Sequence, residues 1–365
     1  MSSVRYSVVF ISVALLLLGA CRDPQGGAEP VRGDLQRTGV YVESGGGLVE
    51  ELWRSSAATR LDHAPVVAGA QVVWGGADGV LRASALDSGV TLWQVRLEGA
   101  ISASPAIVSG RIYVPTHNGS VEVVRLDDGE VLSTIKVETP ITTSPLIYGD
   151  QLVVGCGDGS LRAFSIPLAK QLWMLKGGRN IKGDPALFNG VLYVGNGDGM
   201  LRAVDLFTGV EKWSFNARGA IEASPVVANG VVYVGARSRV FYALDALNGK
   251  RLWSFRAGNE VRSGAALTDK LVIFASDNSR VYALDKSSGE EVWQVRTHGM
   301  IDAAPVAARG TVYFGSRDQH VYAIDASTGA LKNRWGAGSW VMADPVPVAN
   351  SLLIATRAGD LVRMR

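Results

Sequence analysis

Short apolar runs separated by turn residues recur along most of the chain. In residues 221–255 the runs IEASPVVA, VVYVGA, VFYALD and KRLWSF are divided by NG, RSR and ALNG. Runs of this length, rich in Val, Tyr and Phe and bounded by Gly and Asn, are typical of β-strands. Asn-Gly suits a tight hairpin turn, because both central residues of such a turn have positive φ and Asn and Gly tolerate this conformation. The pattern therefore predicts four short strands joined by tight turns.

The four-strand pattern repeats with a period of forty residues. One series marks the start of the first strand, with alanine in the single gap at position 265: Pro65, Pro105, Pro145, Pro185, Pro225, Pro305 and Pro345. A second series marks the fourth strand, with Ser133 and Asn333 as exceptions: Trp53, Trp93, Trp173, Trp213, Trp253 and Trp293. Two series that share one period over the whole region predict an internal structural repeat.

Repeats of about forty residues with four strands each predict an all-β, eight-bladed β-propeller over residues 48–365. We expect each tryptophan of the second series to dock its blade against the next. The last repeat ends at Arg365 after its third strand, whereas Trp53 belongs to a fourth strand with no preceding three. We therefore expect the N-terminal strand to complete the last blade.

The N-terminus has the pattern of an export signal. Residues 1–20 contain Arg5, then the apolar run VVFISVALLLL, and LGAC follows at 18–21. This ending resembles the lipobox of bacterial lipoproteins, which implies lipidation at Cys21. Arg22 after the cysteine implies an outer-membrane lipoprotein that faces the periplasm, anchored to the membrane by its lipid. Residues 21–47, rich in Gly, Pro and charge, are predicted to be a flexible tether.

Composition excludes several kinds of chemistry. With 36 basic and 34 acidic residues, the chain lacks the excess of positive charge expected of a nucleic-acid-binding protein. No HExxH, phosphate-binding loop or Ser-His-Asp pattern is recognisable, so we expect no catalytic residues, no metal and no cofactor. Cys156 has no disulfide partner once Cys21 is lipidated, and it occupies a slot that holds small residues in other repeats. We interpret it as a packing residue.

The phrase Ala-Leu-Asp-x-x-Thr/Asn/Ser-Gly-x-x-x-Trp, best matched at residues 203–213, 243–253 and 283–293, resembles the tryptophan-docking repeat of pyrroloquinoline-quinone (PQQ) type propellers. Two branches share this repeat, namely periplasmic quinoprotein dehydrogenases and non-catalytic lipoproteins such as the outer-membrane assembly factor BamB. The enzyme branch would imply a calcium-bound PQQ, adjacent cysteines and a catalytic aspartate. The BamB branch agrees with the lipobox and implies partner contacts on the links entering the fourth and fifth blades. The nearest matches there are Lys182 and Glu222.

The residue three positions before each proline slot is expected to surround the mouth of the central channel. These residues differ in charge from blade to blade: Asp62, Ser102, Thr142, Lys182, Glu222, Arg262, Asp302 and Met342. The neighbouring turns of blades five to seven add further charges: Arg237, Arg239, Arg280, Arg317 and Asp318. These charges are candidates for a recognition surface, because loops on one face of repeat proteins often bind ligands. The alternative is a solvated rim whose charges neutralise one another in pairs.

These patterns favour a monomeric, non-catalytic scaffold that binds protein, BamB-like and with outer-membrane assembly machinery as its expected partner. The residues we expect to contact the partner carry charge at the channel mouth: Lys182, Glu222, Arg262, Asp302, Arg237, Arg239 and Arg317. Two alternatives remain open. One is a PQQ-binding quinoprotein or small-ligand sensor at the same mouth, and the other is a carbohydrate or cell-wall binding propeller.

Overall fold

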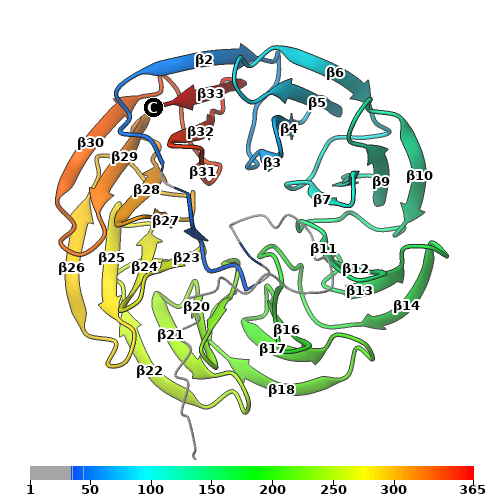
Figure 1. Ribbon diagram of the computed structural model, residues 1–365. Coiled ribbons are helices and arrows are strands. Elements are labelled where there is room, and N and C mark those ends of the chain that lie inside the picture. Colours follow the sequence, from blue (N-terminus) through cyan, green and yellow to red (C-terminus); the bar gives the residue numbers. More distant parts are fainter. Residues whose placement is uncertain (1–33, 35, 44) are drawn as a thin grey trace, which may run out of the picture.

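Eight blades of four antiparallel strands, one of which gains a short fifth strand in parallel, are arranged radially around a central axis in the computed structural model, which confirms the predicted propeller (Figure 1). The structure describes residues 34, 36–43 and 45–365, and all regular elements in these ranges are β-strands. Within them no helix is long and apolar enough to cross a bilayer. The sheets are called blades 1–8 in chain order.

In blades 1 to 7 the four strands of the repeat run outward in chain order, so that the fourth strand is outermost. Blades 1 to 4 comprise, in order, β3 (Val66–Ala68), β4 (Gln71–Gly75), β5 (Val80–Ala85), β6 (Thr91–Arg96); β7 (Ala106–Val108), β8 (Arg111–Pro115), β9 (Ser120–Arg125), β10 (Val131–Lys136); β11 (Leu146–Tyr148), β12 (Gln151–Gly155), β13 (Leu161–Ser165), β14 (Lys170–Leu175); and β15 (Ala186–Phe188), β16 (Val191–Gly195), β17 (Met200–Asp205), β18 (Glu211–Asn216).

Blades 5 to 7 follow the same plan, whereas blade 8 takes its outer strand from the N-terminal side of the chain. They comprise β19 (Val226–Ala228), β20 (Val231–Gly235), β21 (Val240–Asp245), β22 (Arg251–Arg256); β23 (Ala265–Leu267), β24 (Leu271–Ser276), β25 (Arg280–Asp285), β26 (Glu291–Arg296); β27 (Val306–Ala308), β28 (Thr311–Gly315), β29 (His320–Asp325), β30 (Leu331–Gly336); and β31 (Val346–Val348), β32 (Ser351–Ala355), β33 (Asp360–Met364) with β2 (Glu51–Ser56).

Closure of the ring occurs where the two ends of the chain meet in blade 8. Strand β2 pairs antiparallel with β33, with Trp53 opposite Arg363. Arg54 and Asp360 add an ion pair of 2.8 Å across the two strands. The predicted closure by the N-terminal strand is therefore confirmed, and it supplies the fourth strand of blade 8.

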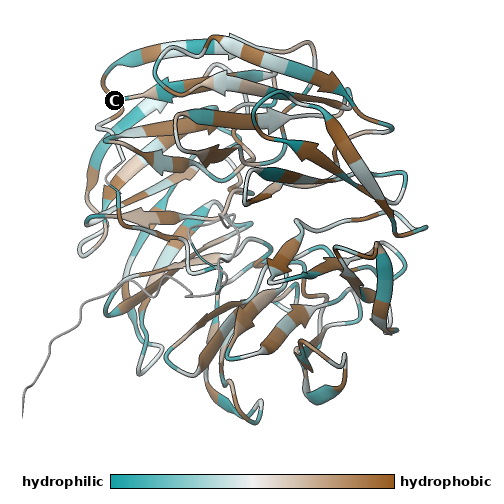
Figure 2. Ribbon diagram, turned by 45° about the vertical axis from the view of Figure 1, so that its right-hand side comes forward, coloured by the Kyte–Doolittle hydropathy of each residue, from teal (hydrophilic) through white to brown (hydrophobic). Residues whose placement is uncertain are grey.

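The core consists of apolar layers between neighbouring blades. One such layer joins Tyr193 and Leu201 of blade 4 to Val234 and Tyr242 of blade 5, and each of the other blade interfaces has its own layer. Hydrophobic residues accordingly gather on the strands, and hydrophilic residues gather on many of the turns (Figure 2). Burial of apolar surface between blades is thus the main force that holds the ring together.

Six tryptophans link successive blades by one repeated contact. Each indole Nε1–H donates to the backbone carbonyl found 33 residues later in the next blade, at 2.8 to 3.1 Å. Each ring also covers a glycine of that blade: Trp213, for example, lies over Gly249, whose φ is +71°. A β-carbon at Gly249 would come within 2.6 Å of the Trp213 ring. The repeated phrase therefore encodes the contact between blades.

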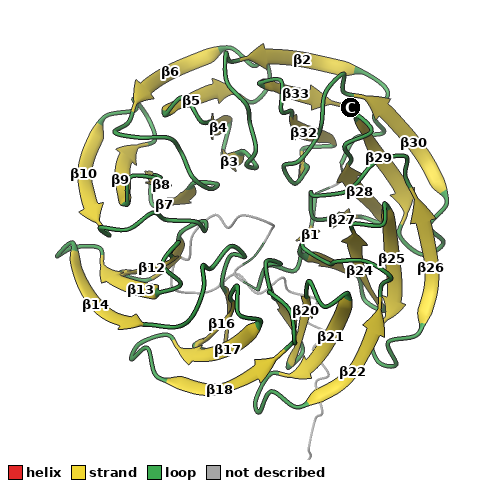
Figure 3. Cartoon of the chain, turned by 180° about the vertical axis from the view of Figure 1, so that it is seen from behind, coloured by secondary structure: helices red, strands yellow, loops and turns green. Residues whose placement is uncertain are grey.

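A segment before the first blade lies against the inner strands of blades 5 to 7, inside the ring. Its strand β1 (Val40–Tyr41) pairs in parallel with β27 (Figure 3). Upstream, the carbonyls of Gln36, Thr38 and Gly39 accept hydrogen bonds from inner strands of blades 5, 6 and 7. This axial segment, residues 36–41, belongs to the stretch predicted as tether. The boundaries of the signal peptide and tether stay predictions, because residues 1–33 lie outside the described residues.

Candidate partner-binding surface

A series of charged side chains follows the inner ends of blades 4 to 7. They come from two loops of each blade, namely the link that enters the innermost strand and the turn between the second and third strands. We call this group the charged arc, and it comprises Lys182, Glu222, Arg237, Glu260, Arg262, Asp277, Asp302 and Arg317. Both loops lie at the same end of the antiparallel strands, so the fold brings them together.

The first half of the arc connects blades 4, 5 and 6. Lys182 Nζ lies 2.8 Å from Glu222 Oε1, forming an ion pair between the links of adjacent blades. Arg237 Nη1 lies 3.7 Å from the same oxygen, and Arg237 Nε donates to Glu260 Oε2 at 2.9 Å. Charges of alternating sign therefore continue from one blade to the next.

The second half of the arc connects blades 6 and 7. Arg262 Nε lies 2.7 Å from Asp277 Oδ2, and Arg262 Nη2 lies 3.6 Å from Asp302 Oδ1. Asp302 in turn accepts two hydrogen bonds from Arg317, at 2.5 and 2.8 Å. This two-pronged geometry fixes the orientation of the Arg317 guanidinium.

The arc ends on an exposed aromatic ring. The guanidinium of Arg317 lies 5.2 Å from the ring centroid of Trp340, and that of Arg357 lies 5.0 Å from it. Trp340 is nevertheless 37% exposed. Tryptophan and arginine are the residues that most often dominate the binding energy of protein interfaces. This end of the arc is therefore the part best suited to anchor a partner.

Ion pairing also shifts the pKa of groups in the arc. The hydrogen bond to Glu260 raises the pKa of Arg237, and the bond to Asp302 raises that of Arg317. Burial raises the pKa of Asp277 above its ordinary value, although the neighbouring Arg262 opposes the shift. Arg237 and Arg317 thus keep their charge at any physiological pH.

The structure places the sequence-predicted charges in different ways. Lys182, Glu222, Arg262, Asp302, Arg237 and Arg317 all belong to the arc. Arg239 does not join it: this residue lies two positions after Arg237 in the same turn, with φ of +66°. Asp62 pairs instead with Arg60 in the link of blade 1, at 2.9 Å.

Sequence reasoning missed Glu260, Asp277, Trp340 and Arg357. A signal for Asp277 is present in the register, because the link position and the turn position fifteen residues later carry opposite charges in three successive blades. These pairs are Glu222 with Arg237, Arg262 with Asp277, and Asp302 with Arg317. Glu260 has no such signal, because it lies two positions before Arg262 in the link and its partner Arg237 belongs to the turn of the preceding blade.

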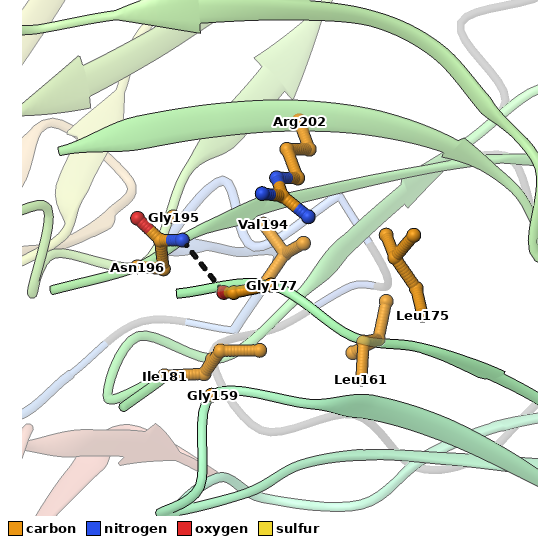
Figure 4. Close-up of a pocket in the computed structure, with 9 residues that line it drawn as sticks. All are labelled: Gly159, Leu161, Leu175, Gly177, Ile181, Val194, Gly195, Asn196 and Arg202. Atoms are coloured by element: carbon orange, nitrogen blue, oxygen red, sulfur yellow. Dashed lines mark hydrogen bonds between the residues drawn. The ribbon is translucent and has the colours of Figure 1, made fainter. Parts of the chain in front are cut away.

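An internal cavity between blades 3 and 4 is too small to be a ligand site. It measures about 10 Å³ and is lined by Leu161, Leu175, Ile181 and Val194, with Arg202 at its edge (Figure 4). The nearby Asn196 Nδ2 donates to the carbonyl of Gly177 at 2.9 Å. A volume of this size accommodates at most one water molecule. This cavity therefore contributes to packing and offers no room for a substrate.

Potential metal ligands are dispersed. Among the described residues, no three His, Cys, Asp or Glu side chains are grouped so as to hold a metal ion. Turn aspartates have local partners instead: Asp78 accepts from the Val80 N–H, and Asp158 accepts from the Ser160 N–H. Cys156 is fully buried between blades 2 and 3, and burial raises the pKa of its thiol to about 11. Such a thiol is a poor nucleophile.

The eight blades and the repeated indole contact define a tryptophan-docking β-propeller of the PQQ-like repeat class. A family model described as "Outer membrane protein assembly factor BamB" matches residues 40–146, 77–180, 157–268 and 248–363 in overlapping stretches. The chain therefore belongs to this family of repeat propellers. A search of curated protein sequences found no match.

Solved structures with the same fold have diverse functions. The computationally designed Ika8 protein superposes with a TM-score of 0.78 at 20% identity, over 86% of this chain and 99% of its own. BamB from Moraxella catarrhalis superposes with a TM-score of 0.74 at 18% identity, and the match covers 86% of this chain and 98% of that protein. Quinohemoprotein alcohol dehydrogenase from Comamonas testosteroni superposes with a TM-score of 0.79 at 14% identity, and the match covers 93% of this chain and 80% of that protein. At these identities the likeness establishes the fold alone.

Proposed function

We propose that this chain is a non-catalytic, lipid-anchored scaffold that binds a protein partner at the outer membrane, in the manner of an outer-membrane assembly factor. The observation that carries the proposal is the charged arc with Trp340 at its end. An exposed aromatic ring held between two guanidinium groups is a suitable anchor, and alternating charges beside it would fix the register of a partner.

The arc is suited to recognition because its charges are balanced internally. Four cationic and four anionic side chains are paired with one another at 2.5 to 3.7 Å. A neutral, patterned surface has little long-range attraction for nucleic acid or for an anionic bilayer. It discriminates instead by the positions of individual charges, and this favours a protein partner with a complementary pattern.

A calcium-bound PQQ does not fit the residues at the mouth of the propeller. Glu222, Glu260, Asp277 and Asp302 are all ion-paired with basic side chains, which compete with a metal ion for their oxygens. The axial segment also occupies backbone hydrogen-bonding groups of blades 5, 6 and 7. In the described part of the chain the free cysteine, Cys156, is buried. These features favour the scaffold over a quinoprotein.

The lipobox at residues 18–21 supports an anchor at Cys21, in a part of the chain outside the described residues. Metabolic labelling with a fatty-acid analogue tests this part of the proposal. We expect the wild-type protein to be labelled and to fractionate with the outer membrane. The Cys21→Ser protein should remain unlabelled, and equal labelling of both proteins would rule out the anchor.

Crosslinking in the cell envelope tests partner binding. A Lys182→Glu, Glu222→Lys, Arg262→Glu protein should lose its crosslinked partner, which mass spectrometry of the wild-type complex identifies, while its circular dichroism spectrum stays unchanged. Undiminished crosslinking by this variant would show that the partner binds elsewhere. Addition of PQQ and calcium, followed by absorbance and dye reduction, tests the enzymatic alternative. Sedimentation with purified peptidoglycan tests the cell-wall alternative.

A further inference from the structure

A groove separate from the charged arc lies between the outer strands of blades 4 and 5. It encloses about 610 Å³, and part of its lining is Phe215 and Asn216 at the end of β18, with Arg218 in the link that follows. The other wall belongs to β21, β22 and the turn before them. Volumes of this size are typical of sites for small molecules.

Strand pairing explains why two arginines face this groove. In blade 5, Arg256 pairs with Val240, and Arg251 pairs with Leu244 after a register shift that skips one residue. Both arginines therefore project from the same face of the sheet as Tyr242. That face is turned towards blade 4, because the Tyr242 ring packs edge-on against Phe215 with centroids 5.2 Å apart.

The three arginines of the groove differ from those of the charged arc in their contacts. In the ranges that the structure describes, the guanidinium groups of Arg218, Arg251 and Arg256 form no ion pair and no hydrogen bond, in contrast to the arginines of the charged arc. Three cations lining one cavity repel one another unless an anion lies between them. Their arrangement is therefore suited to an anionic ligand.

The backbone at Arg218 supports the same conclusion. Its φ of +58° is in the left-handed region, and three other blades place a glycine at the equivalent position: Gly178, Gly258 and Gly338. Glu138 is the further non-glycine case. A long cationic side chain in a conformation that favours glycine is a local strain, and such strain clusters at binding sites. Here it directs a third guanidinium to the groove.

A buried hydroxyl completes the lining. Ser238 lies in the turn before β21, and its Oγ is buried without a hydrogen-bond partner. A buried polar atom without a partner is destabilising, and a ligand oxygen would satisfy it. The groove thus combines three guanidinium groups, one unused hydroxyl and the apolar surface of Phe215 and Val240.

We propose that this groove binds a phosphate monoester, with its phosphoryl oxygens bound by Arg218, Arg251 and Arg256. Guanidinium groups match phosphate because their planar N–H pairs donate to two oxygens at once. Ser238 would donate to the remaining oxygen, and the organic part of the ligand would lie against Phe215. The ligand is either a free phosphorylated metabolite or a phosphomonoester lipid headgroup, since both present the same chemistry.

The experiment uses the Cys21→Ser protein, which lacks the anchor, and two probes. Isothermal titration with glycerol 3-phosphate at constant ionic strength tests the free ligand, with glycerol as the neutral comparison. Sedimentation with phosphatidylcholine vesicles, with and without phosphatidic acid, tests the headgroup. We expect binding of at least one phosphate probe, and the arm that binds identifies the source.

Substitutions then locate the site. The Arg251→Gln, Arg256→Gln protein should bind the phosphate probe at least about tenfold more weakly, because charge-assisted hydrogen bonds are lost. Arg218→Gly should also weaken binding while folding normally, since glycine adopts the same φ. Arg296→Gln is the matched control, because Arg296 holds the position of Arg256 one blade later and is also exposed.

Absence of binding in both arms would overturn the proposal. It would also be overturned if Arg296→Gln weakened binding as much as the groove variants, because the phosphate would then bind to surface charge in general. The groove does not include the charged arc, so either result leaves the proposed scaffold function to be judged by its own experiment.

Discussion

The contact between Trp213 and Gly249 provides a direct test of how the blades are held together. The Trp213 indole donates to the Ala246 carbonyl at 3.0 Å, and its ring packs against Tyr193 with centroids 5.8 Å apart. Replacing a packed tryptophan by alanine costs about 3–5 kcal/mol. The Ala246 carbonyl keeps the hydroxyl of Tyr193 as a second donor at 3.0 Å, so it is not left without a partner. Because Trp213 is only partly buried, we expect Trp213→Ala to lie at the lower end of this range, about 3 kcal/mol.

Gly249→Ala should destabilise the protein for two separable reasons. Its φ of +71° adds about 1–2 kcal/mol of backbone strain for any residue with a β-carbon. The new methyl would also lie 2.6 Å from Trp213 Cε3, and overpacking of this kind costs about 1–3 kcal/mol. Only the second effect depends on the tryptophan. In the double variant the clash is absent, so the two changes should couple by about 1–3 kcal/mol.

The assay is equilibrium unfolding in urea at about 25 °C, followed by far-ultraviolet circular dichroism for the wild type, both single variants and the double variant. Gly110→Ala is the control, because Gly110 has the same φ of +71° but no atom lies within 4 Å of the place a β-carbon would take. It should lose about 1–2 kcal/mol, whether or not Trp213 is present. A coupling free energy below about 0.5 kcal/mol between Trp213 and Gly249 would refute the docking interpretation.

Three further predictions concern closure, the free thiol and acid stability. Deleting residues 48–56 removes β2 and the indole contact of Trp53, so the melting temperature should fall by at least about 5 °C; an unchanged melting curve would contradict closure. In the Cys21→Ser protein, iodoacetamide at pH 8 should modify Cys156 only after denaturation, because burial raises the thiol pKa to about 11, and rapid labelling of the native protein would contradict this. Hydrogen bonds from Ser287 and Ser327 lower the pKa of Asp285 and of Asp325, respectively. The ionised aspartates therefore stabilise the folded protein above the unfolded pKa of about 3.9, and this stabilisation is lost as the pH falls below that value. An Asp285→Asn, Asp325→Asn protein should therefore show a smaller drop in melting temperature between pH 5 and pH 3, and an identical drop would contradict the assignment.

The sequence was sufficient to predict the architecture because proline marks seven of the eight blades and tryptophan marks six, both with one period of forty residues. Trp53, one period before Trp93, was enough to locate the strand that closes the ring. The axial segment could not be predicted in this way. Gln36, Thr38 and Gly39 are held through their backbone carbonyls, and backbone groups are the same in every residue.

The candidate site was only partly predictable for a different reason. The link residues Glu222, Arg262 and Asp302 were recognisable because their charge varies within one register. Their pairing with the turn residues depends on side-chain reach across a loop, and Glu260 reaches Arg237 from outside both registers. The groove between blades 4 and 5 is similar, since Arg218 in the link after β18 and Arg256 at the end of β22 meet only through the packing of neighbouring blades.

The central claim, that the pattern of charge in the arc is recognised by a protein partner, is tested most directly by exchanging one ion pair. Lys182→Glu with Glu222→Lys reverses the pair that is joined at 2.8 Å without changing the net charge. The matched control exchanges Arg60 and Asp62, which form a pair of 2.9 Å in the link of blade 1. Affinity for the crosslinked partner, measured by surface plasmon resonance, should fall at least about tenfold for the first exchange and remain unchanged for the second. Wild-type affinity after exchange of Lys182 and Glu222 would contradict the claim.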